Sequence, residues 1–103
     1  MGFLSALFGN NSNSDLKSLI DQGAFLVDVR TPGEYSEGHV KGSVNIPLDS
    51  ISSKISQFKG KDSIVVFCRS GNRSGQAKAI LEANGIKNVV NGGTWQHVNQ
   101  YIS

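Results

Sequence analysis

Runs rich in apolar residues alternate with segments of helical periodicity along most of the chain. Four of these runs have the length and the β-branched content of strands buried on both faces: residues 24–29, 43–48, 63–67 and 88–90. The segments between them space their apolar side chains three or four positions apart, as Ile51, Ile55 and Phe58 show. Regular alternation of strand and helix predicts βαβ units. We therefore expect an α/β fold with a mainly parallel sheet and helices on both faces.

Residues that start and stop helices delimit the segments between the strands. The expected helices cover residues 14–23, residues 49–58, residues 74–84 and a last segment through Trp95 and Val98. Ser14 and Asp49 are the expected N-caps of the first two helices, because their side-chain oxygens accept hydrogen bonds from unpaired helical N–H groups. Gly85 occupies the C′ position of the third, where a left-handed backbone favours glycine. The glycines at 92 and 93 are expected to form the turn before the last segment.

The sequence TPGE at residues 31–34 is a complete helix-start signal. Thr31 fits the N-cap, Pro32 the first helical position and Glu34 the third, which together make a capping box. A short helical turn should therefore begin directly after the first strand.

Residues 1–13 are expected to form an arm that precedes a single domain at residues 14–103. The apolar part of the arm, residues 3–8, is too short to span a bilayer, and no basic region precedes it as in a secretory signal. Ala6 stands where an N-myristoylation motif needs Ser or Thr. We interpret the segment as a loosely held arm, with a docking stripe for a partner as the alternative. The absence of basic residues from it disfavours membrane contact.

Composition excludes several classes of function. The formal net charge is +2 and the lysines are scattered, which does not suit nucleic-acid binding. A single cysteine cannot form an internal disulfide. Cys68, His39 and His97 also lack the spacing of a zinc site. We expect a cytoplasmic protein that holds no metal and no cofactor.

The cysteine lies where a parallel sheet places its functional groups. Cys68 directly follows the most β-branched run and opens the loop CRSGNRS at residues 68–74. If a helix starts near Ser74, the peptide N–H groups of residues 69–73 curl around the sulfur and form a concave anion-binding nest. Gly71 supplies the positive φ that such a nest requires. The first helical turn adds further N–H groups and the positive end of its dipole.

These surroundings favour the thiolate form of Cys68. Arg69 and Arg73 contribute two permanent positive charges. Similar environments lower a cysteine pKa from about 8.5 to roughly 3.5–7.5, which makes the thiolate available as a nucleophile at neutral pH. The alternative is an inert core thiol, since free cysteines are often buried. We predict Cys68 as the catalytic residue, with its substrate or persulfide cradle formed by Arg69, Ser70, Gly71, Asn72, Arg73 and Ser74.

The chain resembles the single-domain rhodaneses, a family of sulfurtransferases. The resemblance covers residues 14–98 and rests on LVDVRTPGEYSEGHVKGSVNIPL at 26–48, on IVVFCRSGNRS at 64–74 and on GGTW at 92–95. It implies a compact α/β domain with a five-stranded parallel sheet. It also implies that Cys68 takes sulfane sulfur from thiosulfate or a persulfide donor, carries it as a persulfide, and passes it to cyanide or a thiol.

Phosphatases with a related loop are the main alternative enzyme class. Their Cys-x5-Arg motif wraps a phosphoryl group, whereas only four residues separate Cys68 from Arg73. The shorter ring of N–H donors fits one extra sulfur atom better than a tetrahedral phosphate. No aspartate stands in a clear general-acid loop either, so phosphatase activity is disfavoured.

Two non-enzymatic or narrower functions stay open at the sequence level. A rhodanese-type fold can serve as a binding module without turnover, but such modules typically lack the cysteine or have a broken loop. A persulfide carrier dedicated to one partner protein has the same motifs as a free-standing enzyme. Because the chain has no second cysteine to resolve a persulfide, the acceptor must be external: cyanide, a small thiol, a thioredoxin-like protein or another sulfur acceptor.

Three residues outside the loop are candidates for supporting roles. Asp28 and Arg30 follow the first strand and are expected to lie at the same sheet edge as Cys68. We interpret them as an ion pair or a loop brace rather than as acid–base groups, since charges at a strand end are rarely left unpaired. Trp95 is equally suited to core packing and to a pocket wall. His39 is not needed as a base if Cys68 is already ionised.

Overall fold

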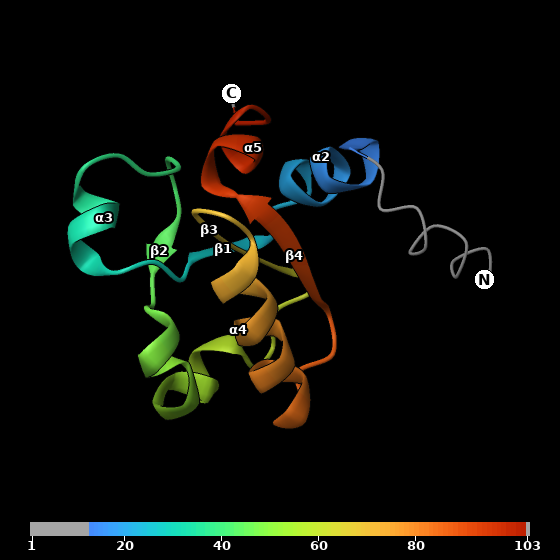
Figure 1. The fold of residues 1–103 in the computed structure, drawn as a ribbon. Helices are drawn as coiled ribbons and strands as arrows, with labels where there is room; N and C mark the ends of the chain where they lie inside the picture. Colours follow the sequence, from blue (N-terminus) through green and yellow to red (C-terminus); the bar gives the residue numbers. More distant parts are fainter. Residues whose placement is uncertain (1–12, 103) are drawn as a thin grey trace.

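The computed structural model of the chain describes residues 13–102. The elements, in chain order, are α2 (Asn13–Asp21), β1 (Phe25–Asp28), α3 (Pro32–Ser36), β2 (Val44–Asn45), the 3-10 helix η1 (Leu48–Phe58), β3 (Ile64–Cys68), α4 (Asn72–Ala83), β4 (Val89–Thr94) and α5 (Trp95–Asn99). Figure 1 shows their arrangement. The predictions made for the arm fall outside the described residues, apart from residue 13, at which α2 begins.

The strands form one parallel sheet in the order β2-β1-β3-β4. The predicted α/β class and parallel sheet are thereby confirmed. The described residues contain four strands, one at each of the four apolar runs of the sequence, rather than the five that the family resemblance implied. No helix within residues 13–102 is long and apolar enough to cross a membrane.

The side chains of β3 alternate between two hydrophobic layers. Ile64, Val66 and Cys68 face a layer that contains residues of α4 and η1. Val65 and Phe67 face the other layer, to which α2 and α5 contribute. All five side chains are buried, so β3 is the central strand of the core. Helices therefore cover both faces of the sheet, as Figure 1 shows.

Two of the four predicted capping signals are confirmed: the capping box at Thr31 and the C′ glycine at 85. The side chain of Thr31 accepts a hydrogen bond from the Glu34 N–H, and Glu34 Oε1 accepts one from the Thr31 N–H at 3.0 Å, which completes the capping box. Gly85 occupies the C′ position of α4, after the C-cap Asn84, with a φ of 85°. The N-caps expected at Ser14 and Asp49 are wrong. The helix α2 already begins at Asn13, and η1 begins at Leu48 with Pro47 before it and without a side-chain cap.

Two strand predictions differ from the structure. The run 43–48 forms only the short strand β2, since Pro47 has no N–H and interrupts a regular ladder. In contrast, β4 continues through the glycines at 92 and 93, which were expected to form a turn. A Cβ at Gly92 would lie 2.8 Å from both Val65 Cγ1 and Val98 Cγ2. Glycine is required at 92 because side chains of β3 and α5 pack directly against the backbone of β4 there. This requirement comes from tertiary packing and not from the local sequence.

Candidate active site

Cys68 ends the central strand at the carboxyl edge of the sheet. Its backbone pairs in register with Thr94 at the end of β4. Its side chain has 0% exposure and belongs to the hydrophobic layer beneath α4. The thiol is therefore buried, and its chemistry depends on the polar groups that reach it from the following loop.

Two polar groups of the loop contact the Cys68 sulfur. The Gly71 N–H donates a hydrogen bond to Sγ at 3.0 Å, and the Ser74 hydroxyl oxygen lies 3.5 Å from Sγ. Gly71 has a φ of 94° and is the N-cap of α4, so its positive φ agrees with the sequence expectation. The helix begins at Asn72 rather than near Ser74. This earlier start places Ser74, which is fully buried, in the first turn next to the sulfur.

The balance of burial and hydrogen bonding lowers the pKa of Cys68. Burial by itself raises this pKa. Hydrogen bonds from the Ser74 hydroxyl and from the backbone of Ser74, Ser70 and Gly71 act in the opposite direction, and together they outweigh burial. The thiolate is thus stabilised by donors that converge on a buried sulfur.

Arg73 binds a carboxylate rather than the sulfur. Its Nη1 and Nη2 atoms donate to Glu34 Oε1 and Oε2 at 2.7 Å and 3.0 Å. This pairing raises the pKa of Arg73, and attraction to Cys68 is a smaller cause of the same change. The hydrogen bond from Arg73, with a further one from Thr31, lowers the pKa of Glu34 to about 2. Sequence reasoning explained Glu34 by capping alone and missed the ion pair, which joins segments distant along the chain.

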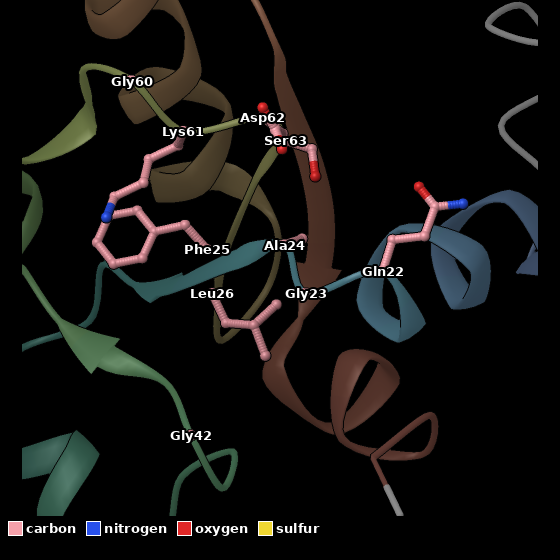
Figure 2. Close-up of a pocket in the computed structure, with 10 residues that line it drawn as sticks. All are labelled: Gln22, Gly23, Ala24, Phe25, Leu26, Gly42, Gly60, Lys61, Asp62 and Ser63. Atoms are coloured by element: carbon pink, nitrogen blue, oxygen red, sulfur yellow. The ribbon is translucent and has the colours of Figure 1, made fainter.

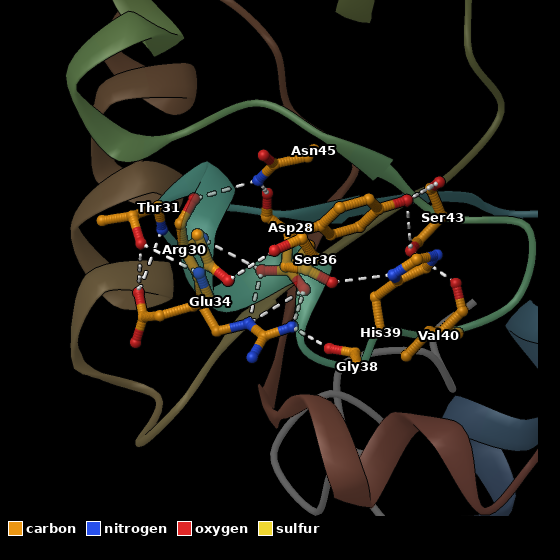
Figure 3. A network of polar contacts seen from close by, with 12 residues as sticks. Asp28, Arg30, Thr31, Glu34, Ser36, Gly38, His39, Val40, Ser43 and Asn45 are labelled. Carbon is orange, nitrogen blue, oxygen red and sulfur yellow. Dashed lines mark hydrogen bonds and ion pairs between the residues drawn. The ribbon is translucent and has the colours of Figure 1, made fainter.

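Asp28 and Arg30 form the ion pair that their positions predicted. Both side chains are buried, and Arg30 Nη2 lies 2.7 Å from Asp28 Oδ2. Arg30 Nη2 also donates to the Gly38 carbonyl at 2.7 Å, so the pair braces the loop between α3 and β2 (Figure 3). The Arg30 guanidinium lies 4.8 Å from the centre of the Trp95 ring. These contacts are structural and leave neither charge unpaired.

Trp95 both packs and lines a pocket. It is half-buried against the layer that contains Val98. It also forms a wall of a pocket of about 250 Å³, to which Arg30 and the exposed Arg69 contribute. Cys68 does not line this pocket, but the pocket adjoins its loop through Arg69. Within residues 13–102, Arg69 makes no ion pair, so its charge is available at the mouth of the site.

Asn91 is a site residue that sequence reasoning missed. It lies on β4, and its side chain forms hydrogen bonds with Ser74, with Gly93 and with Gly71. Asn91 thus ties the loop and the first turn of α4 to the neighbouring strand. No local pattern marked it, because its proximity to the loop arises from strand pairing.

The contacts of the two histidines, His39 and His97, are with residues outside the cysteine loop. The His39 ring stacks on Tyr35 with 3.8 Å between the ring centres, and its Nδ1 is 2.8 Å from the Tyr35 carbonyl oxygen. His97 Nδ1 is 3.0 Å from Gln100. Neither ring has a hydrogen bond to residues 68–74 within the described part of the chain.

A second pocket lies at the opposite end of the sheet. Its volume is about 420 Å³, and its lining includes residues just before β3 and around the start of β1 (Figure 2). The Lys61 ammonium lies 4.7 Å from the centre of the Phe25 ring. Because Cys68 ends β3 and Ser63 precedes it, the length of the strand separates this pocket from the sulfur.

The fold and the cysteine loop define a rhodanese-like domain, and comparison with known proteins agrees. The family model described as "Rhodanese-like domain" matches residues 12–94, and the chain belongs to this family. PspE, a thiosulfate sulfurtransferase of Escherichia coli, is 41% identical over 69 residues, which cover 65% of this chain and 66% of PspE. YrkF of Bacillus subtilis, whose name proposes a sulfur-carrier role, is 34% identical over 71 residues. That match covers 69% of this chain and 38% of YrkF.

A solved structure supports the same assignment. The E. coli structure described as a rhodanese with anions has a TM-score of 0.67 and 36% sequence identity. The match covers 73% of this chain and 91% of that chain. This chain thus spans about two thirds of PspE and about two fifths of YrkF, but nearly all of the solved rhodanese.

Proposed function

We propose that this protein is a sulfurtransferase that carries sulfane sulfur as a persulfide on Cys68. The observation that carries the proposal is the convergence of the Gly71 N–H and the Ser74 hydroxyl on a buried sulfur whose pKa is lowered. The names of relatives such as the thiosulfate sulfurtransferase PspE support the reaction class.

In the first step, the Cys68 thiolate attacks the outer sulfur of a donor such as thiosulfate. A new S–S bond forms to Cys68 while the S–S bond of the donor breaks, and sulfite leaves with that electron pair. Arg69 is the exposed cation at the mouth of the site and attracts the anionic donor. Because Cys68 is buried, we infer that its loop opens to let the donor reach the sulfur.

In the second step, a nucleophile removes the outer sulfur of the persulfide. The thiolate of a thiol acceptor, or the carbon of cyanide, attacks that sulfur; the bond to Cys68 breaks, and the cysteine returns to its thiolate form. Backbone N–H groups stabilise the negative charge of the terminal sulfur before transfer, as an oxyanion hole stabilises oxygen. The acceptor is cyanide or an external thiol, because Cys68 is the only cysteine of the chain.

Mass spectrometry of the intact protein tests the proposal. Treatment with thiosulfate should add one sulfur atom that maps to Cys68 and is lost on addition of cyanide. The Cys68→Ser variant should gain none. A folded wild-type protein that never gains sulfur from thiosulfate, glutathione persulfide or a protein persulfide would contradict the proposal.

A dedicated sulfur carrier is the second candidate, supported by the likeness to YrkF. The two functions differ in which donor reacts quickly. A general enzyme turns over thiosulfate with cyanide or small thiols, whereas a carrier reacts quickly only with a protein persulfide or a protein acceptor. Transfer rates measured with thiosulfate, glutathione persulfide and a protein persulfide separate them.

A further inference from the structure

The Asn91 side chain bridges the cysteine loop, the first turn of α4 and the end of β4. Its Nδ2 donates to the Gly71 carbonyl at 3.2 Å. Its Oδ1 accepts from the Ser74 hydroxyl at 2.7 Å and from the Gly93 N–H at 2.9 Å. Both Gly71 and Ser74 also contact the Cys68 sulfur. Asn91 therefore forms hydrogen bonds with both Gly71 and Ser74, the two residues whose groups contact the sulfur.

The partners of Asn91 determine which way its carboxamide points. The Gly71 carbonyl can only accept a hydrogen bond and the Gly93 N–H can only donate one. The NH₂ group must therefore face Gly71, and the oxygen must face Gly93. Because an amide oxygen only accepts, the Ser74 hydroxyl is the donor in its contact with Asn91.

This orientation creates a competition for one proton. A serine hydroxyl has a single hydrogen, so Ser74 cannot donate to Asn91 and to Cys68 at the same time. When Cys68 is a thiol, its S–H can donate to the Ser74 oxygen while Ser74 donates to Asn91. A thiolate has no hydrogen to donate, and the Ser74 hydroxyl stabilises it only by turning from Asn91 to the sulfur, in addition to the backbone of Ser74.

We propose that Asn91 is a positioning residue that competes with the Cys68 thiolate for the Ser74 hydroxyl and thereby tunes how readily the sulfur ionises. This role of Asn91 matters for the proposed function, in which the Cys68 thiolate attacks a sulfur donor and then carries a persulfide. The competition itself needs no donor molecule.

The switch leaves no buried group without a partner. When the hydroxyl turns to the sulfur, Asn91 Oδ1 keeps the Gly93 N–H, and its exposed side chain is open to water. The Gly71 carbonyl also accepts from the Gly75 N–H at 3.1 Å, so it depends little on Asn91. Turning the hydroxyl therefore breaks only the hydrogen bond between Ser74 and Asn91.

Charged groups around the sulfur do not replace this control. Arg69 follows Cys68 in the loop, Arg73 lies on α4 and pairs with Glu34 of α3, and at the end of β1 the carboxylate of Asp28 pairs with a buried arginine. Within residues 13–102, none of these side chains has a hydrogen bond to Ser74 or Asn91. Arg73 interacts with Cys68 through electrostatic attraction, whereas the Ser74 hydroxyl acts by contact.

Titration of the Cys68 thiolate in the wild type and in three variants tests the proposal. The ultraviolet absorbance of the thiolate is followed against pH, with Cys68→Ser as the blank. Asn91→Ala removes the competing acceptor, so the Cys68 ionisation constant should increase roughly two- to tenfold, the scale of one hydrogen bond. Ser74→Ala should decrease it. In the Ser74→Ala background, Asn91→Ala should have no effect.

Several outcomes would overturn the proposal. One is a Cys68 ionisation constant that falls or stays unchanged in Asn91→Ala. Another is an effect of Asn91→Ala on this constant that is equally large in the wild-type and the Ser74→Ala backgrounds. Asn91→Asp is a second, independent probe, because its carboxylate is a stronger acceptor and keeps the side-chain shape. It should lower the ionisation constant more when Ser74 is present than in Ser74→Ala, and an equal effect in both would contradict the competition.

This test is separate from the test of sulfur transfer. The titration uses no sulfur donor, so it remains valid for a protein that never forms a persulfide. Conversely, mass spectrometry of the thiosulfate-treated wild type reports on transfer whatever the variants of Asn91 show.

Discussion

Glu34 and Arg73 bind each other through two hydrogen bonds of 2.7 Å and 3.0 Å. The pair joins α3, which follows the first strand, to the first turn of α4, which carries the cysteine loop. Glu34 also completes the capping box with Thr31 (Figure 3). One carboxylate therefore caps the start of α3 and holds Arg73 at the start of α4. Its charge pairs with the arginine that had been expected to face the sulfur.

Glu34→Gln should make the protein less stable at neutral pH and less sensitive to acid. The ion pair is only partly buried, so its loss should cost roughly 0.5–1 kcal/mol. The folded-state pKa of Glu34 is lowered from 4.5 to about 2, so its contribution is complete above pH 4.5 and is lost as the pH falls towards 2. Urea unfolding between pH 7 and pH 2 measures both effects.

Arg73→Gln is the matched control for this prediction. It removes the arginine of the ion pair and leaves the capping box intact. It should therefore also reduce the loss of stability between pH 4.5 and pH 2. The double variant with Glu34→Gln should be little less stable than either single variant, because one interaction is removed in all three. A loss of stability between pH 4.5 and pH 2 that is as large in Glu34→Gln as in the wild type would contradict the assignment.

Asp28→Ala should destabilise the fold strongly. It leaves the buried Arg30 guanidinium without its carboxylate, which typically costs about 3–5 kcal/mol. The double variant Asp28→Ala with Arg30→Met removes both charges and should recover part of that loss. Midpoints of urea unfolding at neutral pH compare the two. If the double variant is instead less stable than Asp28→Ala, the unpaired charge of Arg30 is not the reason why Asp28→Ala is destabilised.

Gly92→Ala should cost about 1–3 kcal/mol, because the new methyl group would overlap Val65 and Val98 at 2.8 Å. Gly33→Ala is the matched control. Gly33 lies in α3 with no atom within 4 Å of an added Cβ, so alanine should be neutral or stabilising there by roughly 0.5–1 kcal/mol. Thermal unfolding measures both. Equal melting temperatures for the two variants would show that Gly92 is not constrained by packing.

Most of the secondary structure could be predicted from local patterns, and the departures have identifiable causes. The apolar runs correspond to the four strands, and the capping box at Thr31 is present as expected. Pro47 shortened one strand through its missing N–H. The glycines at 92 and 93 looked like a turn, but one of them is required by the close packing of Val65 and Val98. Such a requirement has no local signature.

The sequence by itself determined the α/β class, the alternation of strands and helices, and the position of Cys68 at a strand end before a glycine-containing loop. These features depend on periodicity and on φ preferences, which act between near neighbours. Only the tertiary structure decided that Arg73 binds Glu34 and that Asn91 engages Ser74. Each of these contacts joins residues far apart in the chain, and their geometry depends on how helices and strands pack, which no short segment specifies.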